Sequence, residues 1–147
     1  MSRREIGNGR PATYARLFER LEDEYGKLDP DTIFAIIGFA VGGPVNMCER
    51  KAQRLFVTCE LSAYEEQQPS AEGLKFEFFC KDEFDEDQAR AIFTALGALS
   101  MEATLGDDHT VDLSQIAKAR VNVVRLHLFS RVTIEGAEYG LYRVRSA

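Results

Sequence analysis

The sequence contains few of the side chains from which catalytic and metal sites are usually built: two histidines, three cysteines and no tryptophan in 147 residues. The cysteines, Cys48, Cys59 and Cys80, are an odd number, and none belongs to a C-x-x-C motif. Zinc and redox sites typically use such motifs, and a complete disulfide framework needs an even number of cysteines. We therefore expect no metal, no cofactor and a reducing, cytoplasmic location.

Long hydrophobic runs are also missing. The longest, Ile33–Val41, has nine residues and is followed by Gly42-Gly43-Pro44, whereas a membrane-spanning helix needs about 20. The first ten residues, MSRREIGNGR, do not lead into the apolar stretch of a secretory signal. Gly42-Gly43-Pro44 lacks the Lys-Ser/Thr of a phosphate-binding loop and predicts a sharp turn instead. We expect no contact with a membrane.

The chain also lacks an excess of positive charge. It has 18 basic and 24 acidic side chains, which give a formal net charge of −6. Proteins that bind nucleic acid cluster lysine and arginine to neutralise phosphates. We therefore expect no nucleic-acid partner.

The residues that are present predict a single domain over residues 1–147, with residues 1–10 as a flexible N-terminal segment. The hydrophobic fraction of 45% is enough for a core that needs no disulfides. Apolar spacings of three and four predict helices over about 11–25 and 85–99, the second begun by a capping box of Asp85 and Gln88. Strand periodicity follows at 32–41, 54–62, 74–81, 121–134 and 139–145.

The order of these elements is helix, three strands, helix, two strands. Strands that are grouped favour an α+β fold, with a mainly antiparallel sheet of about five strands packed with two main helices. The run at 32–41 is apolar on both alternating faces and predicts a central strand, with a short buried helix as the alternative that the pattern leaves open. In the run at 74–81, alternation opposes Leu74, Phe76, Phe78 and Cys80 to Lys75, Glu77, Phe79 and Lys81. In the final hairpin, Val124, Leu126, Leu128 and Val132 are expected to point inward.

Charge is distributed unevenly along the chain. Residues 60–87 contain ten acidic side chains and two basic ones, Lys75 and Lys81. This region includes a long loop at 63–73, and long loops in compact domains often carry function. A segregated acidic surface can steer a basic protein partner, although it can equally be a solvated face. The candidate partner-binding residues are Glu65, Glu66, Asp82, Glu83 and Glu86.

One histidine lies where it could act as a base. His109 follows Asp107 and Asp108 in a polar turn, and a carboxylate can orient an imidazole for proton transfer. These three residues are the candidates for a small-molecule site or an enzyme. The alternative interpretation is a turn that is rich in aspartate for backbone reasons alone.

The middle of the chain, about residues 42–111, contains several short motifs in a fixed order: LFVTCELS (residues 55–62), Pro69, Phe76-Glu77-Phe78, ALGALS (residues 95–100), and Gly106 with His109-Thr110. In this order of features the chain resembles bacterial suppressor-of-fused-like domains. The chain departs from the family where two aspartates separate Gly106 from His109. The resemblance implies an α+β protein-binding module, and many bacterial members look like immunity proteins for secreted toxins.

Together these observations favour a non-enzymatic, cytoplasmic protein-interaction domain of the immunity type, which binds a basic partner through an acidic surface. The alternative is a small-molecule-binding protein or enzyme that uses His109 with Asp107 or Asp108. A structural subunit of a homo-oligomer is the third alternative.

Overall fold

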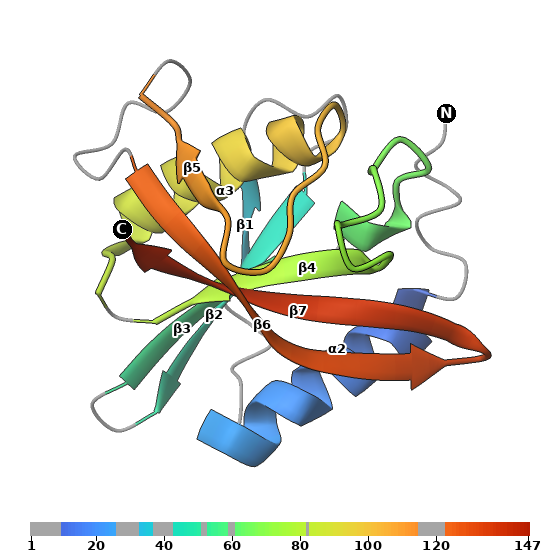
Figure 1. Ribbon diagram of the computed structural model, residues 1–147. Coiled ribbons are helices and arrows are strands. Elements are labelled where there is room, and N and C mark those ends of the chain that lie inside the picture. The colour runs from blue at the N-terminus through green and yellow to red at the C-terminus, as the bar shows by residue number, and fades with distance from the viewer. Residues whose placement is uncertain are drawn as a thin grey trace.

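A sheet of seven strands separates two helices in the computed structural model of the chain (Figure 1). The structure describes residues 10–25, 33–36, 43–50, 53–58, 61–81, 83–114 and 123–147. In chain order the elements are α2 (Arg10–Tyr25), β1 (Ile33–Ile36), β2 (Gly43–Arg50), β3 (Gln53–Thr58), the 3₁₀-helix η1 (Leu61–Ala63), β4 (Lys75–Cys80), α3 (Glu86–Ser100), β5 (Thr110–Asp112), β6 (Val123–Ile134) and β7 (Ala137–Ser146). Apart from Arg10, the predicted N-terminal segment lies outside the described residues.

The strand order is β1-β2-β3-β4-β7-β6-β5, and each described pair is antiparallel except β4 with β7. The predicted α+β class and the mainly antiparallel sheet are therefore confirmed, with β2 and β5 added to the expected strands. The predicted central strand at 32–41 is wrong, because β1 lies at one end of the sheet. The predicted turn at Gly42-Gly43-Pro44 is also wrong in part, since Gly43 and Pro44 begin β2 and pair with β1.

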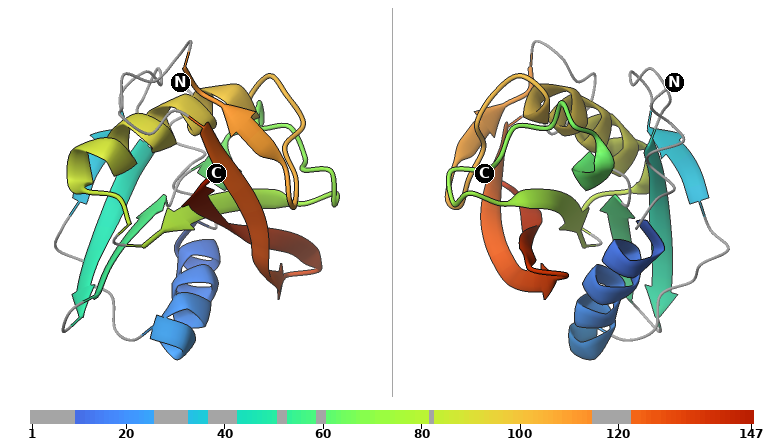
Figure 2. Two further views of the ribbon diagram at one scale, coloured as in Figure 1. Left: turned by 60° about the vertical axis from the view of Figure 1, so that its left-hand side comes forward. Right: turned by 90° about the vertical axis from the view of Figure 1, so that its right-hand side faces the viewer.

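The two helices bury opposite faces of the sheet (Figure 2). On one face α3 contributes Ile92, Phe93 and Leu96 to the larger core cluster. On the other face α2 contributes Leu17 and Leu21 to the smaller cluster. Both helices carry the apolar stripe that the spacing predicts. At the start of α3, Asp85 accepts a hydrogen bond from the Gln88 backbone N–H, and the predicted capping box is confirmed.

β4 lies in the middle of this arrangement and is buried on both faces. Phe76 and Phe78 pack in the α3 cluster, whereas Phe79 packs in the α2 cluster. Glu77 is 1% exposed, although the alternation pattern grouped it with Lys75 and Lys81. Glu77 projects from the α2 side of the sheet, as does its partner Leu141 in β7, and its carboxylate is bonded by Thr58 and by Leu61 and Ser62 of η1.

The β6–β7 hairpin contains an irregularity that changes which side chains face which helix. Leu128 pairs with Tyr142 and Ser130 with Leu141, so Phe129 is an extra residue in β6. Such a β-bulge reverses the alternation beyond it. Val124 and Leu126 consequently face α3, whereas Val132 and Ile134 face α2. The prediction that Val132 shares a face with Val124 and Leu126 is therefore wrong.

The turn of this hairpin has two residues, Glu135 and Gly136, with φ angles of 51° and 85°. Positive φ at both positions is typical of a type I′ turn, whose twist matches that of the flanking strands. The turn fixes the pairing of Ile134 with Ala137 and thus the register of β6 with β7.

Candidate functional site

The turn that contains His109 is held against β6 by its backbone. The Asp108 N–H donates to Leu126 O at 2.7 Å, and the Leu126 N–H donates to His109 O at 2.9 Å. Asp107 Oδ1 accepts from the Leu128 N–H at 2.7 Å, and Asp108 lies 3.6 Å from the Arg125 guanidinium. His109 itself is exposed. Within the described contacts, the two carboxylates bind the backbone and an arginine rather than the imidazole.

The predicted acidic set is divided between the two ends of α3. Glu65 and Glu66 are exposed on the loop whose Gln68 N–H donates to Ser100 O at 2.8 Å, beside the C-terminal end of the helix. Glu83 precedes the N-terminal end and lies 3.3 Å from Arg143. The 15 residues of α3 span about 22 Å. Asp82 lies outside the described residues, and so does the side chain of Glu86, the first residue of α3.

The loop of Glu65 and Glu66 is paired with a second acidic loop. Ala71 N–H donates to Leu105 O at 2.8 Å, and Asp107 N–H donates to a Glu72 carboxylate oxygen at 3.0 Å. We call residues 64–73 and 101–109 the paired loops. Neither segment contains a lysine or an arginine. The paired loops carry six carboxylates, those of Glu65, Glu66, Glu72, Glu102, Asp107 and Asp108. This juxtaposition joins residues that are up to 43 positions apart in the sequence.

The first of the paired loops is fastened to β4 by two side chains. The Gln67 amide donates to Phe76 O at 2.9 Å and accepts from the Phe76 N–H at 3.1 Å, as a neighbouring strand would. The Lys75 ammonium donates to the carbonyls of Tyr64 and Gln67 at 2.5 and 3.1 Å. Burial lowers the pKa of Lys75 below its usual value, and the carboxylate of Glu66 opposes this shift. These hydrogen bonds hold the backbone of the loop that carries the exposed carboxylates of Glu65 and Glu66.

The other end of this loop is held by a buried tyrosine. The hydroxyl of Tyr142 in β7 lies 2.8 Å from Ser70 Oγ and donates to the Glu72 carboxylate at 2.5 Å. Burial and the bond to Glu72 raise the pKa of Tyr142 well above its usual value. The phenol therefore stays protonated at neutral pH and acts as a hydrogen-bond donor.

A buried carboxylate secures the connection from β3 to the same loop. Glu77 Oε1 accepts from the Thr58 hydroxyl at 2.6 Å and from the Leu61 N–H at 3.2 Å. Its Oε2 accepts from both the N–H and the hydroxyl of Ser62, at 2.8 and 2.6 Å. Burial raises the pKa of Glu77 above its usual value, although these four donors favour the charged form. The cluster is closed from solvent, which makes it structural in character.

The raised pKa of Glu77 gives a prediction for stability against pH. The folded state binds this proton more tightly than the unfolded chain, whose carboxyl titrates near 4.5. The stability due to Glu77 is therefore fully present below pH 4.5 and is lost as the pH rises through the raised pKa. Urea unfolding at a series of pH values measures this loss. The free energy of unfolding of the wild type should fall relative to that of Glu77→Gln as the pH rises. A constant difference would contradict this prediction.

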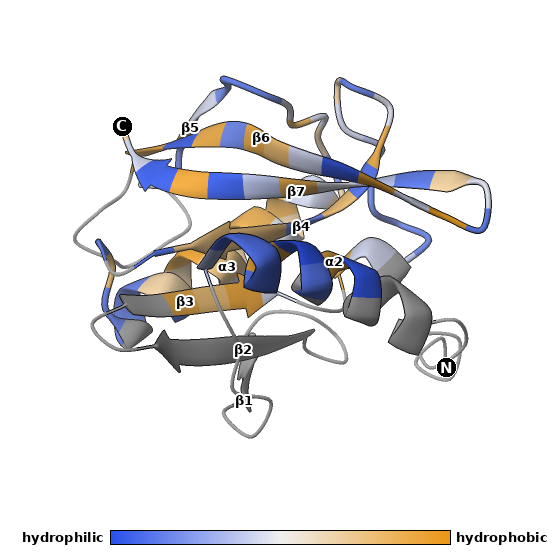
Figure 3. Ribbon diagram, turned by 90° about the horizontal axis from the view of Figure 1, so that it is seen from below, coloured by the Kyte–Doolittle hydropathy of each residue, from blue (hydrophilic) through white to orange (hydrophobic). Residues whose placement is uncertain are grey.

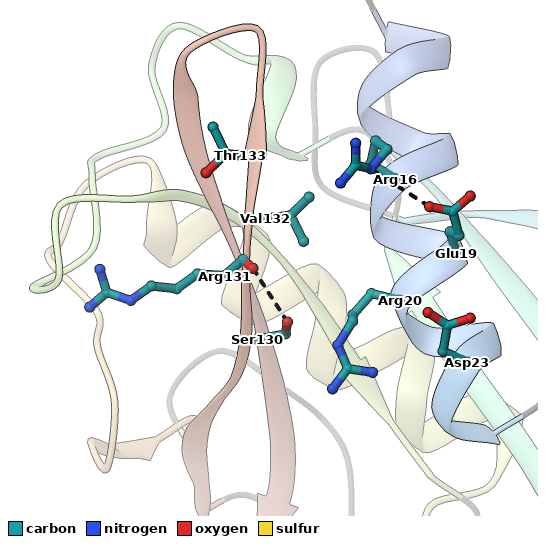
Figure 4. Close-up of a pocket in the computed structure, with 8 residues that line it drawn as sticks. All are labelled: Arg16, Glu19, Arg20, Asp23, Ser130, Arg131, Val132 and Thr133. Carbon is teal, nitrogen blue, oxygen red and sulfur yellow. Dashed lines mark hydrogen bonds and ion pairs between the residues drawn. The ribbon is translucent and has the colours of Figure 1, made fainter.

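A groove of about 370 Å³ lies between α2 and β6 (Figure 4). Arg16 lies 3.7 Å from Glu19 on the same helix, and Arg20 lies over the ring of Phe129, 4.8 Å from its centroid. The side chain of Arg131 extends away from α2 in Figure 4 and lies 3.5 Å from Glu138. The lining residues are Arg16, Glu19, Arg20, Asp23, Ser130, Arg131, Val132 and Thr133. Neither histidine nor cysteine is among these lining residues, and the polar groups of the groove are guanidiniums, carboxylates and hydroxyls.

Two further observations concern the described residues. They contain no group of three or more His, Cys, Asp or Glu side chains that could hold a metal ion. None of the helices among them is long and apolar enough to cross a membrane. Cys80 is buried, and burial raises the pKa of its thiol well above its usual value. Cys59 lies outside the described residues.

Comparison of the chain with protein-family models, curated proteins and solved structures finds no match. The resemblance to suppressor-of-fused-like domains therefore stays a prediction. The structure does connect several of the residues on which it rests. Thr58 and Ser62, from LFVTCELS, both donate to Glu77, from Phe76-Glu77-Phe78.

Sequence reasoning missed the polar residues that hold the loops. Gln67 and Tyr142 belong to no motif, and the motif that contains Glu77 did not indicate its role, because the partners of these residues lie between 9 and 72 positions away. One feature could have indicated Glu77: it is the only acidic residue within an otherwise apolar run, FEFFC. A charged residue in such a run is often buried with dedicated partners.

Proposed function

We propose that this chain is a protein-binding module of the immunity type, and that its paired loops bind a basic protein partner. The observation that supports the proposal is the concentration of six carboxylates, without lysine or arginine, on two hydrogen-bonded loops. Like charges on a fixed backbone create a field that attracts and orients a partner of opposite charge.

Within the paired loops, Glu65, Glu66 and Glu102 contribute most to this surface. All three are exposed. Asp107 and Asp108 are also exposed, but they additionally bind Leu128 N–H and Arg125. Because Gln67 and Lys75 already hold this loop against β4, the loop loses less conformational entropy when a partner binds. The proposed surface thus keeps Glu65 and Glu66 from the residues expected from the sequence. It leaves out Glu83, which lies at the opposite end of α3.

The immunity type and the cytoplasmic location are parts of the same proposal. The first is supported by the resemblance to suppressor-of-fused-like domains, many of which look like immunity proteins. The second is supported by the odd number of cysteines and the absence of C-x-x-C motifs in the sequence. A toxin-like coding sequence beside the gene would supply the first basic protein to test as a partner.

Charge reversal tests the surface. With a basic protein encoded by a neighbouring gene, Glu65→Lys/Glu66→Lys should weaken binding by about tenfold or more and reduce its salt dependence. The measurement is titration calorimetry at low and high salt. The matched control is Glu19→Lys/Asp23→Lys, which makes the same change in net charge on exposed positions of α2. Equal effects of the two double variants would contradict the proposed surface.

A further inference from the structure

Four basic residues form two cross-strand pairs at the open end of the β6–β7 hairpin. Arg125 pairs with Arg145, and His127 pairs with Arg143. Directly paired residues in an antiparallel ladder project from the same face, as do residues two apart on one strand. The alternation of hydrophilic and hydrophobic residues is visible along the C-terminal half of β7 and the adjoining part of β6 (Figure 3). We call these four residues the basic ladder.

The basic ladder projects from the α2 side of the sheet, beyond the end of that helix. The alternate residues Val124, Leu126 and Val144 are buried with α3 on the opposite face. Tyr25 is the last residue of α2, and its ring lies 6.0 Å from that of Phe129, between centroids. The last residue of α2 therefore lies beside Phe129 at the bulge and close to Arg143 and Lys81. The Arg125 side chain is 49% exposed, and Arg145 is exposed.

This arrangement opposes stability. Like charges directly across an antiparallel pair are destabilising, and an arginine opposite an arginine has no neutral form near physiological pH. Two carboxylates compensate in part: Asp108 lies 3.6 Å from Arg125, and Glu83 lies 3.3 Å from Arg143. Arg143 Nε is buried and has no hydrogen-bond partner among the described residues. Lys81, over the Tyr25 ring at 4.9 Å, adds another cation to the same side of the sheet.

We infer that the basic ladder is a binding site for a phosphoryl group. Guanidinium groups match the oxygens of a phosphate in pairs, and clusters of arginine are a common means of recognising phosphorylated ligands. A phosphoryl group carries a charge of about −1.5 to −2 near neutral pH. By binding between Arg125 and Arg145, it would offset the repulsion of that like-charged pair. This surface adjoins the paired loops at Asp108 but consists of other residues, and it goes beyond the proposed function.

The size of the ladder favours a single phosphoryl group over a nucleic acid. Its two rows, two residues apart on each strand, are separated by about 7 Å, which leaves no extended basic track. Asp108 and Glu83 border the ladder at Arg125 and Arg143 and would repel further phosphates on either side. The formal net charge of −6 disfavours a long polyanion for the same reason.

Titration of the isotope-labelled full chain with inorganic phosphate, followed by NMR, tests the inference. Amide shifts at Arg125, His127, Arg143 and Arg145 should saturate, and sodium chloride at the same ionic strength should not reproduce them. Arg125→Gln/Arg145→Gln should weaken phosphate binding by about tenfold or more. The matched control, Arg131→Gln, changes an exposed arginine of β6 beyond the bulge and should leave binding unchanged. Shifts that follow ionic strength alone, or equal losses in both variants, would overturn the inference.

Thermal unfolding is a second test, and it distinguishes a binding role of these arginines from a purely structural one. Arg145→Gln should raise the midpoint in phosphate-free buffer, because it removes one like-charged pair. Added phosphate should raise the midpoint more for the wild type than for this variant. A lower midpoint for Arg145→Gln, with the phosphate response retained, would overturn the inference.

Two further ligands distinguish the source of the phosphoryl group. A phosphoserine peptide that binds more tightly than inorganic phosphate, while its unmodified form does not bind, would assign the site to phosphorylated proteins. Equal affinity for the phosphopeptide and inorganic phosphate would assign it to small phosphorylated molecules. A single-stranded oligonucleotide whose affinity increases with length and exceeds that of the phosphopeptide would overturn the inference in favour of nucleic acid.

Discussion

Replacing Glu77 with alanine should lower the free energy of unfolding by about 3–5 kcal/mol, a large part of the 5–15 kcal/mol typical of a domain. The carboxylate accepts four hydrogen bonds in a site that is closed to solvent. Alanine would leave the backbone N–H groups of Leu61 and Ser62 buried without these acceptors. An unsatisfied buried donor costs about 1–3 kcal/mol, and hydrogen bonds to a charged group are the strongest.

Urea denaturation measures this loss, and Glu66→Ala is the matched control. Glu66 is an exposed glutamate in the same part of the chain, and its replacement should change stability by no more than about 0.5 kcal/mol. Ser62→Ala should fall between the two, because it removes one hydroxyl donor and leaves the backbone donor in place. A loss of less than about 1 kcal/mol for Glu77→Ala would contradict the hydrogen-bonded arrangement.

The effect should also extend to the paired loops. Glu77 holds η1, which leads directly into the loop of Glu65 and Glu66. Loss of the carboxylate should therefore increase amide hydrogen exchange in residues 61–68 before it affects α3, because local opening needs less free energy than global unfolding. The same loop carries the proposed partner surface, so the buried cluster and the exposed carboxylates form one physical unit.

Elements governed by local interactions could be predicted from the sequence. The capping box of Asp85 and Gln88 and the apolar stripe of α3 depend on residues within a few positions of one another. The same is true of the hairpin turn, which was expected at residues 135–138 and is formed by Glu135 and Gly136. These features set helix and hairpin boundaries through short-range hydrogen bonds and backbone preferences. The α+β class followed from the order of such elements.

Features that depend on contacts between distant segments could not be predicted. The alternation in β4 correctly opposed Phe76 to Glu77, but it could not show that Thr58 and η1 enclose the Glu77 carboxylate. The parallel pairing of β4 with β7 joins residues more than 60 positions apart. No local pattern in either strand specifies that contact.

The acidic composition of the candidate site could be predicted from the sequence, but the residues that lie together in space could not. An acidic excess between residues 60 and 87 is evident from the sequence, yet α3 separates Glu83 from Glu65 and Glu66. The contribution of Glu102 and Asp107 depends on hydrogen bonds such as Ala71 N–H to Leu105 O. Such tertiary contacts between loops have no sequence periodicity. The same applies to the basic ladder, whose pairs follow from the register of β6 with β7.

Deleting Phe129 should unfold the domain or separate α2 from the sheet, because it removes the bulge that reverses the alternation of β6. With the original pairing of Ile134 and Ala137 kept, Val124 and Leu126 would turn away from α3. With the pairing at the other end kept, Val132 and Ile134 would turn away from α2. Each side chain that leaves a core loses about 1.5–3 kcal/mol of burial. A slip of one residue therefore costs a substantial part of the stability of a domain.

Phe129→Ala separates the role of the backbone from that of the ring. Alanine keeps the extra residue and the reversal, and it removes the contacts of a partly buried ring with Tyr25, Phe79 and the Arg20 guanidinium. We expect a loss of about 1–3 kcal/mol with a cooperative transition for the substitution, below the 3–5 kcal/mol typical of a fully buried phenylalanine. For the deletion, near-UV circular dichroism and urea unfolding should show that the cooperative transition is lost. A deletion variant as stable as Phe129→Ala would mean that the faces of β6 are assigned by something other than the bulge.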